Sequence, residues 1–379
     1  MPRKKILITI DWFLPGTKSG GPVRSYANMI AHLGVHYDFY IITRDTDYCS
    51  DKVYENVQSN AWNQLDEHTS VYYFSNDRLN KENFKKLLDE TSFDIVYING
   101  IYSWNFSILP LWLLKNHKNV IVAARGMLNP QAFSVKGKRK KLFLRIAKFI
   151  GLYKNVKFHA TNEDEANHII DIFGKQSKIH VAPNLPRLID VKMNSKKDKS
   201  KPTTFANIAR ISTEKGTLRM IDALHDVSSE MVLDIFGPIY DEAYWKLCLK
   251  SIKRLPSHVI VSYKGILASE AVPSVLERYD FFVLLSEGEN FGHAILEAFM
   301  AGCPVIISDQ TPWKQLERQG VGWDIDMSKP PNATAIFEKA CSMSNVDYQK
   351  HSDNTKQLSR EFSKNPDLLM LNLELFNQA

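Results

Sequence analysis

The sequence predicts an α/β protein of two domains, each built on a parallel sheet with helices on both faces. Its 379 residues exceed what one hydrophobic core serves well, so two domains of about 150 to 200 residues are expected. Short apolar runs alternate with amphipathic helical patterns along most of the chain, which is typical of β-then-α units. A polar, lysine-rich stretch over 191–202 separates two such series and indicates a linker.

Composition is that of an ordinary globular protein, with 44% hydrophobic and 24% charged residues. The net charge of +6, from 48 basic against 42 acidic residues, is too mild to indicate nucleic-acid binding. Four widely spaced cysteines without a C-x-x-C pair predict neither disulfides nor a zinc site. No apolar run approaches the ~20 residues of a membrane span. We therefore expect a cytoplasmic protein, with peripheral contact on the inner face of the cell membrane as an option.

The first domain is expected to open with a strand over Lys5–Ile10, a loop rich in turn residues, and a helix over Val23–Leu33. Gly20 and Gly21 end that loop and remove side chains where the backbone approaches something closely, and Arg24 lies in the first turn behind them. Further strands are expected at Tyr37–Thr43, Val71–Phe74, Ile95–Ile98, Val120–Ala124 and Val156–Ala160.

Polar and aromatic residues come after two of these strands. Asn99 stands directly after one strand, and its amide can hydrogen-bond a hydroxyl. Tyr102 and Trp104 come next; aromatic faces stack on sugar rings, although both side chains fit a core or lid role equally well. Arg125 stands at the end of the following strand.

A basic and apolar helix is expected within 136–153. Such a helix can lie on an anionic membrane surface, where each basic residue near the headgroups contributes ~1 kcal/mol. It can equally be a solvated helix whose apolar side packs on its own sheet. Nucleic-acid binding would need an aromatic-plus-basic platform, which the sequence does not offer.

The stretch from Asp280 to Asp309 reads as strand, loop and helix, with an apolar strand over Phe281–Leu285 and a helix over Phe291–Met300. The loop between them lies at the carboxyl edge of the predicted sheet, where ligands bind, and the helix start offers backbone N–H groups to phosphate. Glu289 and Glu297 would lie ~10 Å apart or more at ~1.5 Å per residue, which suits two parts of one long ligand. Carboxylates accept hydrogen bonds from the hydroxyl pairs of sugars and riboses.

A second polar turn comes after the strand over Phe205–Ile208. Arg210 and Lys215 flank this turn ahead of a helix and could hold a diphosphate from two sides. The next strand ends at Gly237.

The segment SEGENFGHAILEAFMAGCPVI resembles the signature of the retaining glycosyltransferases of family 4, in which a Glu, seven residues and a second Glu flank a turn. ARGMLNP and the TPW segment resemble polysaccharide and lipopolysaccharide members, and GGPVRS and ARISTEKG resemble further family segments. The chain departs from the pattern at Asn99, where His is common, and at Leu185 and Ala209, where Gly is usual.

The resemblance implies the GT-B fold, two Rossmann-like domains with parallel sheets facing a central cleft. Residues 1–185 would form the acceptor-side domain, 186–202 a linker, 203–355 the nucleotide-sugar domain, and 356–379 a helix crossing back to the first domain. The implied activity is retaining transfer from a UDP- or GDP-sugar to a saccharide, expected to be lipid-linked, in surface polysaccharide, O-antigen or capsule biosynthesis. No cofactor beyond the donor, no metal and no nucleic acid are expected.

The resemblance also implies roles for the residues picked out above. Arg210 and Lys215 would stabilise the departing diphosphate, Glu289 would hold the transferred sugar, and Arg125 would stand beside it. Donor binding is expected at Glu297, Gly20, Gly21, Asn290, Phe291, Gly292 and Gly237. Acceptor binding is expected at Asn99, Tyr102, Trp104 and Arg24.

Three other functions remain as alternatives. A non-catalytic saccharide- or nucleotide-binding protein of the same fold would accommodate the departures at Asn99, Leu185 and Ala209, although it would not need a complete diphosphate clamp. A sugar-nucleotide epimerase would need acid and base residues in the first domain, and no convincing set is present. An NAD-dependent enzyme would need G-x-G-x-x-G after the first strand, where IDWFLPGTKSGG stands.

Overall fold

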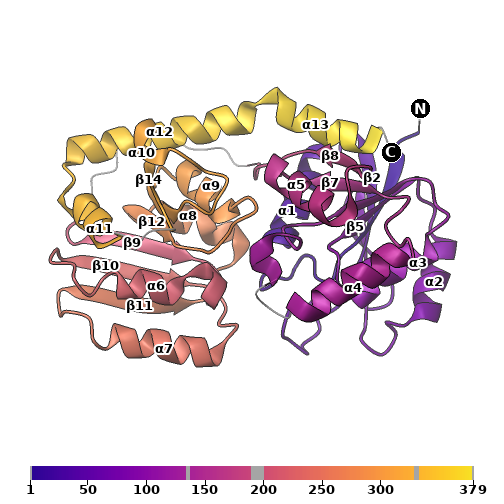
Figure 1. Cartoon of the computed structure of the whole chain (residues 1–379), viewed down its shortest axis with the longest axis horizontal. Helices are drawn as coiled ribbons and strands as arrows, with labels where there is room; N and C mark the ends of the chain where they lie inside the picture. The colour runs from indigo at the N-terminus through magenta and orange to yellow at the C-terminus, as the bar shows by residue number, and fades with distance from the viewer. Residues whose placement is uncertain (1, 134–136, 189–199, 328–332, 378–379) are drawn as a thin grey trace. The chain divides into compact units, whose positions relative to one another are not determined.

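The computed structural model describes residues 2–133, 137–188, 200–327 and 333–377. The chain divides into two compact units: Met1–Leu188 with Asn365–Ala379, and Ile189–Lys364 (Figure 1). The stretch 189–199, which makes up most of the predicted linker, lies outside the described residues.

The first unit is organised around an eight-stranded sheet in which all pairs are parallel except β3 with β4. In spatial order its strands are β3 (Trp62–Asp66), β4 (Thr69–Phe74), β2 (Tyr37–Arg44), β1 (Lys4–Thr9), β5 (Ile95–Asn99), β6 (Val120–Ala123), β7 (Lys157–Ala160) and β8 (Lys178–Val181). Strands β3 and β8 lie at the two edges and were not predicted. Both are largely exposed or half-buried, so no apolar run marks them in the sequence.

Helices and one π-helical turn complete the first unit. They are α1 (Gly21–Leu33), α2 (Lys81–Glu90), the π-helical turn Trp104–Ile108, α3 (Leu109–Leu113), α4 (Gly137–Phe149), α5 (Glu163–Phe173) and α13 (Pro366–Asn377). Proline starts α1 and α3 in their first turns, where its missing N–H costs nothing.

The second unit is built on a fully parallel six-stranded sheet. Its strands in spatial order are β11 (Val259–Gly265), β10 (Met231–Phe236), β9 (Thr203–Ile208), β12 (Phe281–Leu284), β13 (Val305–Ser308) and β14 (Gly322–Ile325). Its helices are α6 (Thr217–Asp222), α7 (Glu242–Ile252), α8 (Val272–Leu276), α9 (His293–Met300), α10 (Leu316–Gln319), α11 (Ala333–Ser342) and α12 (Asn345–Lys364).

Two apolar cores cover the two faces of this second sheet. Phe281 and Val283 belong to the core that α6, α7 and α11 share, whereas Phe282 and Leu284 belong to the core with α8, α9 and α12. Neighbouring residues of one strand point to opposite faces, so a strand covered on both sides is apolar at every position. This is why the run Phe281–Leu285 could be recognised in the sequence.

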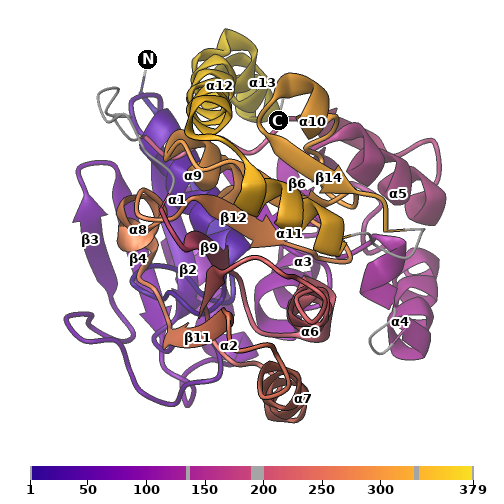
Figure 2. The ribbon, with the colours of Figure 1, turned by 90° about the vertical axis from the view of Figure 1, so that its left-hand side faces the viewer.

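The C-terminal segment passes from the second unit back to the first just before Pro366. Helix α12 packs beside α9 in the second unit (Figure 2), and Ser352 Oγ donates to the Gly302 carbonyl at 2.7 Å. Pro366 cannot continue α12, and α13 packs on the first unit, where Asn372 Nδ2 donates to the Pro183 carbonyl at 2.9 Å. The returning segment therefore begins at Asn365 rather than at 356.

Candidate functional site

The central feature of the second unit is an ion pair between Lys215 and Glu289, with Nζ and Oε1 2.5 Å apart. Lys215 ends the short turn after β9, and Glu289 lies in the loop between β12 and α9. The two side chains are only 16% and 12% exposed. Strands β9 and β12 are neighbours at the centre of the sheet, where the strand order reverses direction. Such a switch point is where open α/β sheets bind ligands at their carboxyl edge.

A glycine allows these two loops to meet. Gly216 has φ of 69°, and a Cβ placed on it would lie 1.9 Å from the Leu285 carbonyl oxygen. No other residue would allow the turn before α6 to approach the end of β12 so closely. The neighbouring Glu287 N–H donates to the Glu214 carbonyl at 2.8 Å, which joins the same two segments through the backbone.

Arg210 lies at the other side of this turn. Its guanidinium is 3.2 Å from the Glu214 carboxylate and stacks over the Tyr240 ring at 5.3 Å. The planar guanidinium is thus oriented on one face by an aromatic ring and at one edge by a carboxylate. Gly237, at the end of β10, packs against the segment before Arg210, since a Cβ there would lie 1.8 Å from the Ala209 carbonyl oxygen.

Helix α9 supplies the remaining predicted donor residues. Gly292 is its N-cap in the left-handed conformation, with φ of 78° and ψ of 60°, and no side chain caps the helix there. Glu297 lies within the helix and is buried. Phe291 is also buried, and Trp313 Nε1 donates to its carbonyl at 2.8 Å. This hydrogen bond from Trp313 holds the loop that carries Asn290.

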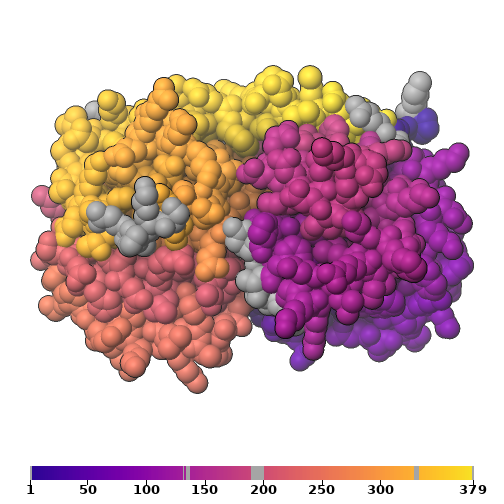
Figure 3. All heavy atoms as spheres, in the orientation of Figure 1, coloured from indigo at the N-terminus to yellow at the C-terminus, as the bar shows by residue number. Residues whose placement is uncertain are grey.

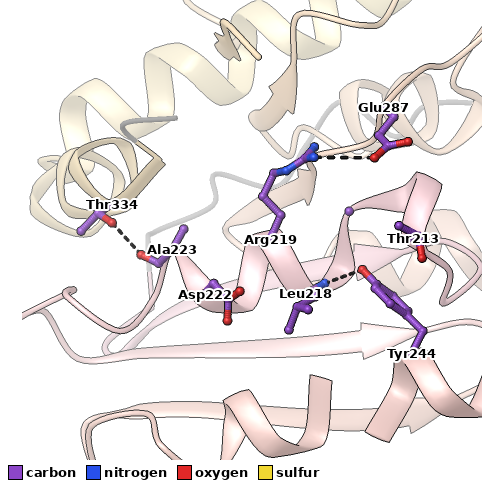
Figure 4. A pocket seen from close by; sticks show the side chains of 9 residues that line it. Thr213, Leu218, Arg219, Asp222, Ala223, Tyr244, Glu287 and Thr334 are labelled. Atoms are coloured by element: carbon purple, nitrogen blue, oxygen red, sulfur yellow. Dashed lines mark hydrogen bonds and ion pairs between the residues drawn. The ribbon is translucent and has the colours of Figure 1, made fainter. Parts of the chain in front are cut away.

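A pocket of about 510 Å³ lies beside the start of α6 (Figure 4). Arg219 points toward Glu287 across it, with 3.7 Å between guanidinium and carboxylate, and the Leu218 N–H donates to the Tyr244 hydroxyl at 2.8 Å. Its lining contains none of the predicted donor residues: it comprises Thr213, Gly216, Leu218, Arg219, Asp222, Ala223, Tyr244, Glu287 and Thr334. We interpret these contacts as support for the turn that carries Lys215.

In the first unit, Arg125 is held by neutral side chains at the end of β6. Its guanidinium donates to Asn184 Oδ1 at 2.6 Å and to the Tyr97 hydroxyl at 3.0 Å, and it stacks over the Tyr26 ring at 4.7 Å. The Tyr97 hydroxyl also contacts His159 Nδ1. Burial, helped by the Arg125 charge, lowers the pKa of His159 to about 3, so this histidine is neutral at physiological pH.

Glu165 anchors the turn that carries Arg125. It is buried in the first turn of α5 and accepts from the Gly126 N–H at 2.6 Å and the Thr161 N–H at 2.7 Å. The start of α5 itself is capped by Asn162, which accepts from the Glu165 N–H at 2.8 Å. The contact with Gly126 spans 39 residues, so spacing along the helix could not indicate it.

The other predicted acceptor residues lie around the same edge. Asn99 ends β5, is 5% exposed, and its Oδ1 has no hydrogen-bond partner in the described residues. Trp104 is 64% exposed, whereas Tyr102 packs edge-to-face against Phe143 of α4. Tyr102 is therefore a packing residue as well as a candidate ligand residue.

The loop before α1 carries the predicted glycines. Gly20 has φ of 78°, and a Cβ at Gly20 or Gly21 would meet nothing within 4 Å. The space beside these two glycines is therefore open, whereas a Cβ at Gly216 would meet the Leu285 carbonyl oxygen. Arg24 lies in the first turn of α1 and is partly buried.

The described residues contain no group of three or more His, Cys, Asp or Glu side chains that could hold a metal ion. The predicted diphosphate contacts are Arg210, Lys215 and the α9 N-terminus, so the sites offer cationic and N–H donors rather than an oxygen cage.

Comparison with known protein families agrees with the geometry of the second unit. Residues 189–358 match the family described as Glycosyl transferases group 1, so this part of the chain is a glycosyltransferase group 1 domain. The chain is 24% identical over 268 residues to the GDP-mannose:cellobiosyl-diphosphopolyprenol alpha-mannosyltransferase of Xanthomonas campestris, covering 68% of this chain and 67% of that protein. It is 27% identical over 234 residues to the protein of the same description from Xanthomonas oryzae pv. oryzae, covering 59% and 58%.

Solved structures resemble the whole chain. The structure of Anabaena HepE in complex with UDP and glucose matches with a TM-score of 0.73 at 18% identity, covering 99% of both chains. WaaG, a glycosyltransferase involved in lipopolysaccharide biosynthesis, matches with a TM-score of 0.67 at 13% identity, covering 97% of this chain and 98% of that chain. The predicted fold class is confirmed: two α/β units with parallel sheets, as in GT-B glycosyltransferases.

Proposed function

We propose that this chain, with its glycosyltransferase group 1 domain, is a retaining glycosyltransferase of family 4. It would move a sugar from a UDP- or GDP-sugar to a lipid-linked saccharide in surface polysaccharide, O-antigen or capsule biosynthesis. The observation that carries the proposal is the largely buried Lys215–Glu289 pair at the switch point of the second sheet. The Xanthomonas relatives, whose names describe transfer from GDP-mannose to a diphosphopolyprenol-linked saccharide, support the same donor and acceptor classes.

The donor diphosphate would bind between the two cations and the start of α9. Lys215 carries three N–H donors, so its ammonium can hold Glu289 with one and a phosphate oxygen with another. Arg210 would add a planar fork that its stack on Tyr240 already orients. As the bond to the sugar breaks, negative charge grows on the diphosphate, and these preorganised donors stabilise it without a metal ion.

The two glutamates would bind the hydroxyl groups at either end of the donor. Glu289 pairs with Lys215, one of the two proposed diphosphate cations, and its carboxylate would accept from hydroxyls of the transferred sugar. Glu297, further along α9, would accept from the ribose hydroxyls. Arg125 is proposed to stand near the transferred sugar, with its guanidinium held by Asn184 and Tyr97.

A thermal-unfolding experiment with UDP, GDP, ADP, dTDP and CMP tests the donor assignment. Ligand at 100 times its dissociation constant adds about 2.7 kcal/mol to the free energy of unfolding, a readable shift. We expect one diphosphate to raise the melting temperature, equally with magnesium or EDTA, and Arg210→Ala to abolish the shift. Arg318→Ala is the matched control, because Arg318 is an exposed arginine of the same unit. No shift with any nucleotide would instead favour a non-catalytic saccharide-binding protein.

Retention of the anomeric configuration is tested by a separate measurement. The anomeric configuration of the product, read by NMR against that of the donor, should be unchanged. An inverted product would rule out the family 4 mechanism while leaving the donor assignment intact.

Helix α4 supports a lipid-linked acceptor at a membrane surface. Leu144 and Ala147 are buried against the sheet, whereas an apolar row on the outer side is exposed: Leu142 57%, Ile146 51%, Phe149 93% and Ile150 63%. Exposed basic residues flank the row, namely Lys138, Arg139, Lys141, Arg145 and Lys148. The helix lies at the surface of its unit, in magenta in Figure 3. A face of this kind fits an anionic lipid surface at the inner side of the cell membrane. Among the described residues, no helix is both long and apolar enough to span a bilayer.

Vesicle co-sedimentation tests this membrane contact. We expect binding to phosphatidylcholine vesicles only when they contain phosphatidylglycerol, and weaker binding at high salt. Replacing Leu142, Ile146 and Phe149 by serine should abolish it, and Val346→Ser, at an 81% exposed residue of the second unit, should not. Equal sedimentation of the triple variant and the wild type would exclude α4 as the contact.

A further inference from the structure

The first sheet has its own switch point, between β1 and β5. From β1 the chain runs outward through β2 and β4, then returns to the other side of β1 as β5 and continues to β6 and β7. The carboxyl ends of β1 and β5 therefore flank the position at which an open α/β sheet forms its ligand crevice. Asp11 lies just after β1, and Asn99 ends β5.

Asp11 is a carboxylate held in place by a neutral partner. Ser103 Oγ donates to its Oδ1 at 2.7 Å, from a residue 92 positions further along the chain. Burial raises the pKa of Asp11, against the hydrogen bond from Ser103, the positive charge of Arg44 and a hydrogen bond from the Asp11 backbone, all of which lower it. The hydrogen bond from Ser103 thus fixes the orientation of the carboxylate, which in its ionised form has further lone pairs that can accept hydrogen bonds.

A second, independent observation lies at the end of the neighbouring strand. Asn99 is more than nine-tenths buried, and its Oδ1 has no hydrogen-bond partner among the described residues. Leaving a buried acceptor unpaired costs free energy, so such groups point to a ligand or an ordered water. The Asn99 backbone is fixed, because its carbonyl accepts from Ser107 Oγ at 2.8 Å.

Ser103 also holds the next turn of the chain. Its hydroxyl accepts from the Phe106 N–H at 3.3 Å and so caps the π-helical turn Trp104–Ile108. Short π-helical segments are frequent at functional sites. The first residue of the turn is Trp104, whose large indole is 64% exposed. One serine therefore holds the Asp11 carboxylate and starts the turn that presents an exposed aromatic ring.

We propose that Asp11, positioned by Ser103, binds a hydroxyl group of the acceptor saccharide, with Trp104 stacking on the sugar ring and Asn99 accepting a second hydroxyl. The inference rests on the proposed function, since it assigns the acceptor side of that reaction. A carboxylate is a strong acceptor for sugar hydroxyls, and an indole face covers the apolar side of a sugar ring. A merely structural Asp11 would need only the hydrogen bond from Ser103, which Asn would keep.

Calorimetric titration with cellobiose and maltose, with UDP and GDP present, tests this site. We expect the wild type to bind at least one of the two disaccharides, and Asp11→Asn to bind it about tenfold or more weakly, as for loss of a hydrogen bond to a charged group. Trp104→Ala should have a similar effect, and Ser103→Ala a smaller one. Circular dichroism checks that each variant is folded.

Two matched controls lie in the same unit. Asp77 accepts from Ser75 Oγ at 2.6 Å but is exposed, so Asp77→Asn makes the same change of carboxylate to amide away from the sheet edge. Trp112 is 48% exposed on α3, so Trp112→Ala removes a comparable indole. Neither should change disaccharide binding.

The outcomes separate this inference from the proposed function. Unchanged disaccharide binding in Asp11→Asn or Trp104→Ala overturns the acceptor site, and so does a wild type that binds neither sugar. Either result leaves the donor assignment untouched if a nucleotide still stabilises the protein and Arg210→Ala loses that effect. Failure of the nucleotide experiment refutes the proposed function itself.

Discussion

The carboxyl edges of the two sheets carry their charges in different ways. In the second unit, each cation of the candidate donor site faces a carboxylate: Lys215 faces Glu289 at 2.5 Å, and Arg210 faces Glu214 at 3.2 Å. In the first unit, Arg125 and Asp11 form their hydrogen bonds with neutral side chains. Direct ion pairs hold the geometry of the second edge, whereas neutral hydrogen-bond partners orient Arg125 and Asp11 at the first edge, with the charges of Glu165 and Arg44 acting on them from nearby.

The largest effect is expected at Gly216, where the turn before α6 closely approaches the end of β12 in the second unit. Gly216→Ala should lower the free energy of unfolding by about 3–5 kcal/mol, because the Cβ would meet the Leu285 carbonyl and the left-handed backbone adds strain. Urea unfolding measures this loss. Gly265→Ala is the control: its φ is 82°, but nothing lies within 4 Å of its Cβ, so only about 1–2 kcal/mol of strain is expected. Equal losses would mean that the contact at Gly216 is not tight.

The next test concerns charge pairing itself. Lys215→Gln or Glu289→Gln leaves one largely buried charge without its partner, at a cost of about 3 kcal/mol in the free energy of unfolding. The double variant should recover most of this loss, which a double-mutant cycle measures. The same cycle at Arg210 and Glu214, which are 36% and 50% exposed, should give a coupling of about 0–1 kcal/mol. If the coupling energy of Lys215 with Glu289 is as small as that of Arg210 with Glu214, the buried ion pair does not stabilise the second unit, and the proposed difference between the two sheet edges is wrong.

In the first unit, the geometry of Arg125 should matter more than its charge. Arg125→Lys keeps the positive charge but cannot reach both Asn184 and Tyr97, so unfolding should be easier by about 1–2 kcal/mol. Chemical denaturation of this variant and of Arg78→Lys, at a 66% exposed arginine, provides the comparison. If the two variants are equally stable, the stability of the first unit does not depend on the hydrogen bonds from the Arg125 guanidinium to Asn184 and Tyr97.

The smallest effect is expected at Asp11, and it has the opposite sign. Burial raises its pKa above the ordinary value of 3.8, so the folded state disfavours the ionised form. Asp11→Asn should therefore slightly raise the melting temperature at neutral pH. The gain should shrink as the pH falls through the raised pKa and vanish below the unfolded value, where both states are protonated. Ser103 and Arg44, which oppose the shift, stay unchanged in this variant. A loss of stability would mean that the Asp11 carboxylate is a structural group.

Much of the fold and part of the candidate site could be predicted from the sequence. The apolar run from Phe281 marked β12 because a strand covered on both faces is apolar at successive positions. Glu289 and Lys215 could be assigned to one site, since each stands in a loop after a strand of the same predicted sheet. Their mutual contact, across 74 residues, appeared only in the structure.

The sequence by itself determined which segments become buried strands and helices, because burial requires local apolar periodicity that can be read directly. Tertiary structure alone decided the edge strand β3, whose exposed residues have no such pattern and which forms by pairing with β4. It also decided the hydrogen bonds from Ser103 to Asp11 and from Gly126 to Glu165, which join residues 92 and 39 positions apart. Such contacts depend on which strand ends become neighbours, and the order of strands in a sheet is set by packing of the whole domain rather than by any local segment.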